Sequence, residues 1–201
     1  MTVLVLLRHG QTEYNAEGRL QGSLDVPLGE HGRNQAAAAA RAIVDGYGVP
    51  DRIVTSPLSR ARDTAAAVGA LVPVPVTVDR RLRQRSYGEW EGLTWDEVKL
   101  RWPRDYERRL RGEDPQIAGW DVAAEVSARV SEALAEACDG ARLVVVVSHG
   151  SAIMLGSLAL LGLDAHATTL GKLPHAHWNV LATAHGGWSL ARYGLSAAAA
   201  D

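Results

Sequence analysis

Two histidine–glycine pairs lie just beyond two apolar runs of the 201-residue sequence. His9-Gly10 follows Val3 to Leu7 after one arginine, and His149-Gly150 follows Leu143 to Val147 after one serine. Continuous runs of β-branched residues and leucine are typical of strands buried on both faces of a parallel sheet. Because open α/β sheets bind ligands beyond the carboxyl ends of their strands, we expect both histidines to face one crevice.

Imidazoles beside guanidinium groups could carry out phosphoryl transfer without a metal. A phosphomonoester carries nearly two negative charges, so the site needs fixed cations, which Arg8 and Arg60 can supply as forked donors. Neutral imidazole is nucleophilic near pH 7, so His9 can attack phosphorus and hold the group as an N–P bond that water later cleaves. His149 would stand beside the same group and donate a hydrogen bond.

Four segments resemble, in order and approximate spacing, the pattern of the histidine phosphatase superfamily, a phosphoglycerate mutase-like family. They are Arg8 to Asn15, Leu20 to Gly22, Ser56 to Ala65 and Ser148 to Gly150, and the resemblance covers nearly the whole chain. It implies an α/β fold with three α/β/α layers, a mostly parallel central sheet and a small cap insertion at roughly residues 80–120 of one domain spanning 1–201. It also implies a branch 1 phosphatase that forms a phosphohistidine and needs no metal or organic cofactor.

The resemblance assigns roles to single residues of this sequence. The catalytic group comprises His9, Arg8, Arg60, His149 and, at the proton-donor position, Gln84. The substrate-binding group comprises Gln11, Thr12, Asn15, Gln21, Gly22 and Gly150. The substrate implied is a small phosphorylated metabolite that the sequence does not name. The alternatives are a phosphoglycerate mutase-type phosphotransferase and a phospholigand-binding protein with weak turnover.

Gln84 departs from the family pattern. Members usually place a glutamate three residues before a Tyr/Phe-Gly pair, here Tyr87-Gly88, and that acid protonates the leaving group. An amide cannot do so, and losing a general acid typically costs about 10²–10⁴ in rate. Three explanations stay open: an introduced change from glutamate, donation by a neighbour such as Glu89, or a natural protein that is slow or takes leaving groups needing little help. Glu89 and Glu91 are more typical of structural residues in the Glu-Trp-Glu-Gly turn.

Other departures concern the entrance to the site. Gly119 to Val122 replaces a run that is commonly Gly-Gly-Glu-Ser, and His175 stands where many relatives place asparagine. His175 and His177 have the spacing that puts both side chains on one face of an extended segment, so a metal pair is conceivable, although no third ligand is in reach by sequence.

Arginines crowd the segment between Arg80 and Arg111, which has two main interpretations, with nucleic-acid binding as a weaker third. They could form salt bridges on a solvated helical face, or they could attract an anionic substrate over the pocket. In the second case Trp90, Trp95 or Trp102 would form an apolar wall.

Periodicity and turn residues predict an alternation of strands and helices. Ser56 is a plausible N-cap, with Pro57 at the first helical position of a helix that runs to Leu71. Glycines around His185 favour a hairpin between the last two strands. The remaining elements are helices over Glu30 to Asp45, Ala123 to Ala137 and Gly150 to Leu161, and strands over Arg52 to Thr55, Val74 to Val78 (short or at an edge), Trp178 to Thr183 and Trp188 to Tyr193.

Composition limits the partners and the location. A net charge of −2 gives no global attraction for nucleic acid or an anionic membrane, so neither is expected as a partner. The single cysteine, Cys138, cannot form an intrachain disulfide, and the apolar start ends at Arg8 after too few residues for a signal peptide or a membrane span. We expect a cytoplasmic protein, and the resemblance allows a homodimer, a state that is common among relatives.

Overall fold

A single mixed sheet organises the computed structural model, which describes residues 1–184 and 186–197. The strand order across the sheet is β3-β2-β4-β1-β5-β6, with β4 and β1 at the centre. The first four strands in this order pair in parallel, whereas β5 pairs antiparallel with β1 and β6 antiparallel with β5. Their bounds are β1 (Val3–Arg8), β2 (Arg52–Thr55), β3 (Val76–Val78), β4 (Leu143–Ser148), β5 (Trp178–Ala184) and β6 (Gly187–Leu195).

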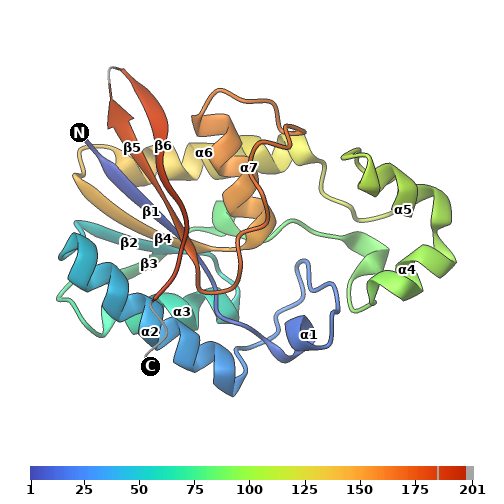
Figure 1. The fold of residues 1–201 in the computed structure, drawn as a ribbon, viewed down its shortest axis with the longest axis horizontal. Coiled ribbons are helices and arrows are strands. Elements are labelled where there is room, and N and C mark those ends of the chain that lie inside the picture. The colour runs from blue at the N-terminus through green and yellow to red at the C-terminus, as the bar shows by residue number, and fades with distance from the viewer. Residues whose placement is uncertain (185, 198–201) are drawn as a thin grey trace.

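Helices cover both faces of the sheet, which gives the three predicted layers (Figure 1). Along β1 the side chains alternate, so that Leu4 and Leu6 pack toward one pair of helices, and Val5 and Leu7 pack toward the other. The first pair is α6 (Ala123–Cys138) and α7 (Gly150–Leu160), and the second is α2 (Glu30–Tyr47) and α3 (Ser59–Gly69). Among the described residues, no helix is long and apolar enough to cross a membrane.

The chain between β3 and α6 projects to one side of the sheet (Figure 1). It contains two short 3₁₀ turns, η1 (Arg80–Leu82) and η2 (Gly88–Trp90), and two helices, α4 (Trp95–Arg101) and α5 (Pro103–Leu110). We call residues 80–120 the cap. Trp90 is fully buried in a separate apolar cluster with Leu20 and Val98, so the cap packs onto the loop around α1 (Glu13–Ala16).

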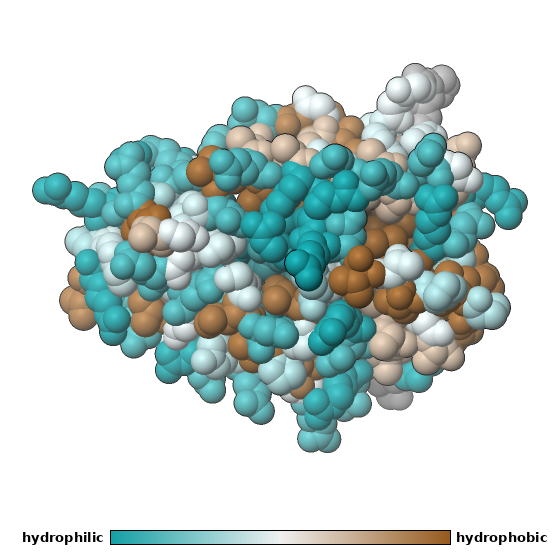
Figure 2. All heavy atoms as spheres, turned by 180° about the vertical axis from the view of Figure 1, so that it is seen from behind, coloured by the Kyte–Doolittle hydropathy of each residue, from teal (hydrophilic) through white to brown (hydrophobic). Residues whose placement is uncertain are grey.

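The surface opposite the view of Figure 1 is mainly hydrophilic, with smaller hydrophobic patches between the polar side chains (Figure 2). Several of the exposed hydrophobic residues belong to the cap, among them Leu100 and Leu110. Scattered exposed apolar side chains of this kind are normal for a globular protein.

The structure corrects several boundaries expected from the sequence. The helix expected from Pro57 begins only at Ser59, with Leu58 at the N-cap and no side-chain bond from that N-cap. The Ser56 hydroxyl accepts from the Leu58 amide at 3.3 Å and also bonds to His149. Strand β3 begins at Val76, so Val74 and Pro75 lie outside it, and it is an edge strand as expected. The helices α4 and α5 were not predicted. Of the expected hairpin, both strands are present, whereas its turn residue His185 lies outside the described residues.

Candidate active site

The two central strands bring the two histidines together. Arg8 at the end of β1 is in register with Ser148 at the end of β4, so the next residue of each strand is a histidine. The rings of His9 and His149 lie 5.1 Å apart, centroid to centroid, and both are buried, with exposed fractions of 2% and 0%. The expected convergence of these imidazoles therefore follows from the parallel pairing of β1 with β4.

His9 is held as a neutral imidazole with one nitrogen free. Its Nδ1 lies 2.7 Å from the Gly10 carbonyl oxygen, and because a carbonyl can only accept, Nδ1 carries the proton and donates it. Burial lowers the pKa of His9 well below its ordinary value, and electrostatic coupling to His149, Arg60 and Arg8 lowers it further. The Nε2 lone pair is thus available at neutral pH.

His149 is also neutral, and Ser56 fixes its ring. The Nε2 atom of His149 lies 2.7 Å from the Ser56 hydroxyl, whereas its buried Nδ1 atom has no hydrogen-bond partner among residues 1–184 and 186–197. Burial lowers its pKa well below the ordinary value, with Arg60 as the next cause. His149 can therefore contribute a hydrogen bond, but not a positive charge, at neutral pH.

Arg8 is buried without a carboxylate partner. Its Nη1 donates to the Leu173 carbonyl at 2.6 Å, and its Nη2 donates to Nε2 of His175 at 2.6 Å. The Nε atom is buried and has no hydrogen-bond partner in the part of the chain that the structure describes. Burial lowers the pKa of Arg8 to about 10, so the guanidinium remains protonated at neutral pH.

Arg60 has a similar setting on the other side of the site. It is 1% exposed, and its two terminal nitrogens donate to the backbone carbonyls of Leu24 at 2.6 Å and Gly22 at 2.9 Å. Its Nε is also buried without a hydrogen-bond partner among the residues described, and burial lowers the pKa of Arg60 to about 10. Among the described residues, neither Arg8 nor Arg60 forms an ion pair, so two positive charges remain available to an anion.

A cavity of about 200 Å³ opens onto these groups. Arg8, His9, Arg60 and Gln84 line it, and the ring of the fully buried His149 lies next to that of His9. The other lining residues are Asn15, Gly18, Arg19, Leu20, Gln21, Gly22, Tyr87, Trp95, Lys172 and His175. A small, strongly cationic cavity with one uncharged nucleophile suits a dianionic phosphoryl group.

The family is shown by sequence as well as by geometry. The profile of the histidine phosphatase superfamily (branch 1) matches residues 4–196. This chain belongs to the histidine phosphatase superfamily. The family, the three-layer fold and the phosphatase class predicted from the sequence are thereby confirmed.

Several relatives of this histidine phosphatase have names that state an activity. A glucosyl-3-phosphoglycerate phosphatase from Mycolicibacterium vanbaalenii is 41% identical over 192 residues, which cover 89% of this chain and 83% of the relative. A metal-independent phosphoserine phosphatase from Arabidopsis thaliana is 33% identical over 190 residues, covering 90% and 76%. A mycobacterial glucosyl-3-phosphoglycerate phosphatase solved with VO3 superimposes with a TM-score of 0.87 at 36% identity, covering 98% of this chain and all of that one.

Three of the expected substrate-binding residues of this phosphatase line the cavity, namely Asn15, Gln21 and Gly22. The side-chain oxygen of Gln21 is buried and has no hydrogen-bond partner in the described segments. The side-chain oxygen of Asn15 accepts from the backbone amide and the hydroxyl of Thr12 and so caps α1. Gln11 and Thr12 do not line the cavity. Thr12 is buried as the N-cap of α1. The backbone N–H of Gln11 donates to the side-chain oxygen of Gln35 at 3.0 Å.

The glycines of the two His-Gly pairs differ in their surroundings. A Cβ atom added to Gly10 would lie 2.2 Å from the backbone oxygen of Gly32, so Gly10 makes room for α2 rather than for a ligand. A Cβ atom added to Gly150 would lie 3.5 Å from Cζ of Arg8, an ordinary contact. Gly150 therefore packs against the Arg8 guanidinium and does not line the catalytic cavity.

Gln84 stands in the cavity wall, and no aspartate or glutamate is among the lining residues. Its side-chain oxygen accepts from the amide of Arg85 at 3.0 Å. Glu89 is exposed and does not line the cavity, which removes the support for it as the substitute proton donor. Glu91 is engaged elsewhere, since one carboxylate oxygen accepts from the amides of Ser23 and Tyr87 and so joins the substrate loop to the cap.

His175 is a further residue of the site that the sequence pattern did not place. Ala176 has a φ of 54°, so the chain turns here and the two histidines do not share one extended face. Nε2 of His175 accepts from Arg8, and burial lowers the pKa of His175 to about 3. The shared face on which a metal pair was conceivable is therefore not formed by these two histidines. No group of three potential ligands among histidine, cysteine, aspartate and glutamate occurs in the described part of the chain.

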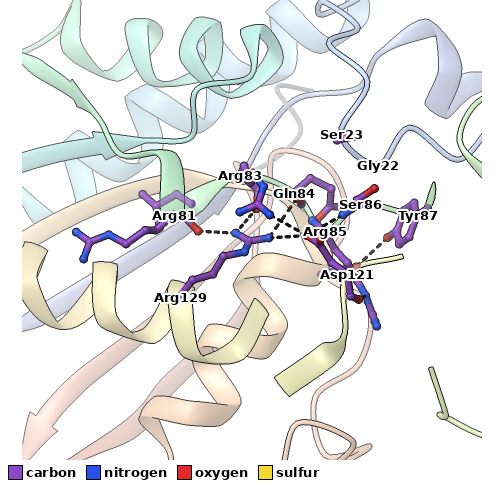
Figure 3. A network of polar contacts seen from close by, with 12 residues as sticks. Gly22, Ser23, Arg81, Arg83, Gln84, Arg85, Ser86, Tyr87, Asp121 and Arg129 are labelled. Carbon is purple, nitrogen blue, oxygen red and sulfur yellow. Dashed lines mark hydrogen bonds and ion pairs between the residues drawn. The ribbon is translucent and has the colours of Figure 1, made fainter. Parts of the chain in front are cut away.

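A polar network fixes the cap segment that carries Gln84 (Figure 3). Arg129 on α6 donates to the backbone carbonyls of Arg81, Arg83 and Gln84, and it contacts the Asp121 carboxylate at 3.4 Å. The Asp121 carboxylate also accepts from Arg83 at 3.2 Å. The network therefore ties the donor position of this phosphatase to the long helix α6.

Proposed function

We propose that this histidine phosphatase hydrolyses small phosphomonoesters through a phosphohistidine on Nε2 of His9. The observation that carries the proposal is a neutral His9, with its Nε2 lone pair free, beside two buried guanidinium groups that have no carboxylate partners. Hydrolysis of p-nitrophenyl phosphate tests it. Wild-type protein should release p-nitrophenolate and phosphate, and His9→Ala should release neither. Unchanged release by His9→Ala would reject the assignment.

The residues divide the work between nucleophile and phosphate clamp. The free Nε–H groups of Arg8 and Arg60 supply donors for phosphoryl oxygens, and their positive charges offset the charge of the dianion. If the Ser56 hydroxyl donates to Nε2 of His149, then Nδ1 of His149 carries the proton and is a third donor. An N–P bond forms at His9 as the ester P–O bond breaks. Water then attacks phosphorus, the N–P bond breaks, and inorganic phosphate leaves.

Because Gln84 cannot donate a proton, the rate of hydrolysis should depend on how much protonation the leaving group needs. The departing alkoxide must take a proton from water or solvent-linked groups, because the amide cannot give one, whereas p-nitrophenolate needs no proton. Restoring the acid in Gln84→Glu should raise hydrolysis of an alkyl phosphate such as glycerol 3-phosphate by about 10²-fold or more and leave p-nitrophenyl phosphate little changed. Glu89→Gln is the matched control and should change neither rate. No gain from Gln84→Glu would reject the missing-donor account.

Gln84 also supports a second candidate, a phospholigand-binding protein with weak turnover. Such a protein would bind inorganic phosphate in the Arg8–Arg60 clamp with measurable affinity and release no phosphate from any phosphomonoester. Titration with phosphate, combined with an assay of phosphate release, separates the two functions. Binding without release favours the binder, and binding with release favours the enzyme.

The relatives support a small phosphorylated metabolite as the substrate, since their names include glucosyl-3-phosphoglycerate and phosphoserine phosphatases. A mutase-type activity would transfer the phosphoryl group to an acceptor instead of releasing it. Measuring free phosphate against a phosphorylated product distinguishes these outcomes. A cytoplasmic location and a homodimer stay predictions.

A further inference from the structure

A second cavity of about 330 Å³ adjoins the catalytic one. Arg8, Gln84, Tyr87, Trp95 and Lys172 line both cavities, so the two spaces share a wall. The second cavity extends away from His9 between the cap helix α5, the start of α7 and the loop before β5. Its volume lies within the usual range of small-molecule pockets.

The shared position of Gln84 indicates what the second cavity would hold. In this fold Gln84 stands where a proton donor faces the leaving oxygen, and its side chain lines both spaces. A phosphomonoester whose phosphoryl group rests against His9 and Arg60 would therefore direct its leaving group past Gln84. The second cavity is the space that this leaving group enters.

Two cations without partners line this second cavity. Arg109 on α5 and Lys172 in the loop before β5 form no side-chain hydrogen bond or ion pair within the described residues. Neighbouring arginines of α5 and its end are used differently, since Arg108 and Arg111 both contact the Glu113 carboxylate. No aspartate or glutamate is among the residues that line the cavity. Its charge is therefore not neutralised by its own wall.

The other residues that line the second cavity limit what the uncharged part of a bound ligand could be. Trp95 and Met154 offer apolar surface, and the hydroxyl groups of Tyr87 and Ser151, which are 2.8 Å apart, offer polar contacts. Trp95 thus takes the part of the apolar wall that the sequence assigned to one of three tryptophans, whereas Trp90 is fully buried outside the cavity. A small, partly polar ligand group that carries a negative charge fits this second cavity.

We propose that this cavity is a leaving-group subsite in which Arg109 and Lys172 bind a second anionic group of the substrate, a carboxylate in the first instance. The proposal rests on the proposed function, because it takes His9 and Arg60 to hold the phosphoryl group. Arg109 supplies a planar fork that matches a carboxylate, and Lys172 supplies a point charge. The enzyme accordingly discriminates between phosphomonoesters of similar size by the charge of the leaving group.

A matched pair of substrates tests the subsite. 3-Phosphoglycerate and glycerol 3-phosphate differ in that a carboxylate replaces a hydroxymethyl group. Wild-type protein should show a kcat/KM at least about 10-fold higher for 3-phosphoglycerate. Arg109→Gln should lower that preference by about 10-fold, through KM rather than kcat, without changing kcat/KM for glycerol 3-phosphate. Lys172→Gln should lower kcat/KM for both substrates, because Lys172 also lines the catalytic cavity, and should lower it more for 3-phosphoglycerate.

The matched control is Arg104→Gln, which removes an exposed arginine of the same helix that does not line the cavity. It should leave both substrates unaffected. Equal kcat/KM values for the two substrates in wild-type protein, or equal losses for both substrates in the variants, would overturn the subsite while leaving the proposed function intact. If neither of these substrates nor p-nitrophenyl phosphate is hydrolysed, the proposed function fails, and calorimetric titration of 3-phosphoglycerate and glycerol 3-phosphate decides the subsite alone. Tighter binding of 3-phosphoglycerate that Arg109→Gln abolishes supports it, and equal binding rejects it.

Discussion

Arg60 at the strand-end site and Arg85 in the cap are both buried, with exposed fractions of 1% and 4%, yet their surroundings differ. Arg60 donates only to backbone carbonyls. Arg85 forms an ion pair with Asp114, donates to the carbonyl of Asp121 at 2.7 Å and lies 4.6 Å from the Trp120 ring centre. The cap neutralises its buried guanidinium, and the active site does not.

This difference separates a charge kept for a ligand from a charge used for folding. Burying a cation without an anion is unfavourable, so the surroundings of Arg8 and Arg60 lower their pKa values toward 10. An incoming phosphoryl dianion removes this penalty, and the resulting attraction is available for binding and catalysis. In the cap the same residue type stabilises the protein through its carboxylate partners.

The largest expected effect comes from breaking the active-site half of this comparison. Arg60→Gln should lower kcat/KM for p-nitrophenyl phosphate by about 10³-fold, because one charged donor to the phosphoryl group is lost. Its free energy of unfolding should change little or rise, since an uncompensated buried charge is removed. Steady-state kinetics and urea unfolding measure the two quantities. A variant that unfolds readily but keeps its activity would assign Arg60 to the fold instead.

Acid should destabilise the active site well before it affects the carboxylates of the cap. His9, His149 and His175 are buried and neutral, so their folded pKa values lie below the unfolded value near 6.5. Below that value the unfolded chain binds protons that the folded chain does not, and stability falls as the pH falls. The free energy of unfolding should decrease by about 3 kcal/mol between pH 6.5 and 5.5, roughly 1 kcal/mol for each histidine.

His175→Asn sharpens this pH test. It removes one of the three buried imidazoles, so the loss over the same pH interval should shrink by about one third. Urea unfolding at both pH values, in buffer free of phosphate, supplies the measurement. Stability that stays constant between pH 6.5 and 5.5 would show that these histidines are not held neutral by the fold.

Replacing the buried arginine of the cap should have the opposite effects to Arg60→Gln: stability should fall, and activity should be kept. Arg85→Gln leaves Asp114 without its cationic partner and should lower the free energy of unfolding by about 2–3 kcal/mol. Since Arg85 does not line the catalytic cavity, activity toward p-nitrophenyl phosphate should be largely retained below the unfolding transition. A loss of activity as great as that of Arg60→Gln, without a loss of stability, would erase the distinction between the two regions.

The smallest expected effect concerns Ser56, which bonds to His149. Ser56→Ala removes the group that fixes the His149 ring and should lower kcat by about 10-fold with KM little changed. Ser59→Ala is a suitable control, because Ser59 is the first residue of α3 and its hydroxyl donates to Asp25 rather than to His149. Equal effects of the two substitutions would place Ser56 among the structural residues of the loop.

Strong local signals explain why part of this structure could be predicted. The runs before His9 and His149 are long, apolar and β-branched, so they fixed two central strands and, through the parallel pairing, the meeting of the two imidazoles. The segment order supplied Arg8 and Arg60. Tyr87 and Lys172 also line the catalytic cavity, but the sequence did not place them there, because they belong to loops whose positions depend on tertiary contacts.

Other features depended on interactions that no short pattern reveals. Ser56 resembled a helix cap, but its hydroxyl bonds to a histidine 93 residues away. The alternation of His175 and His177 suggested an extended segment, but the left-handed Ala176 turns the chain so that His175 reaches Arg8. The arginines of the cap allowed two interpretations, and the contacts divide them: most pair with carboxylates, whereas Arg109 lines a cavity.

Site mapping of the covalent intermediate tests the central claim most directly. Wild-type protein mixed rapidly with p-nitrophenyl phosphate is quenched in alkali, which preserves N–P bonds, and digested for mass spectrometry. The account predicts phosphate on His9, its absence from His9→Ala, and its presence on His9 when His149 is replaced by alanine. Phosphate found on His149 or His175 of the wild-type protein, or phosphate released with no labelled histidine at any time, would contradict it.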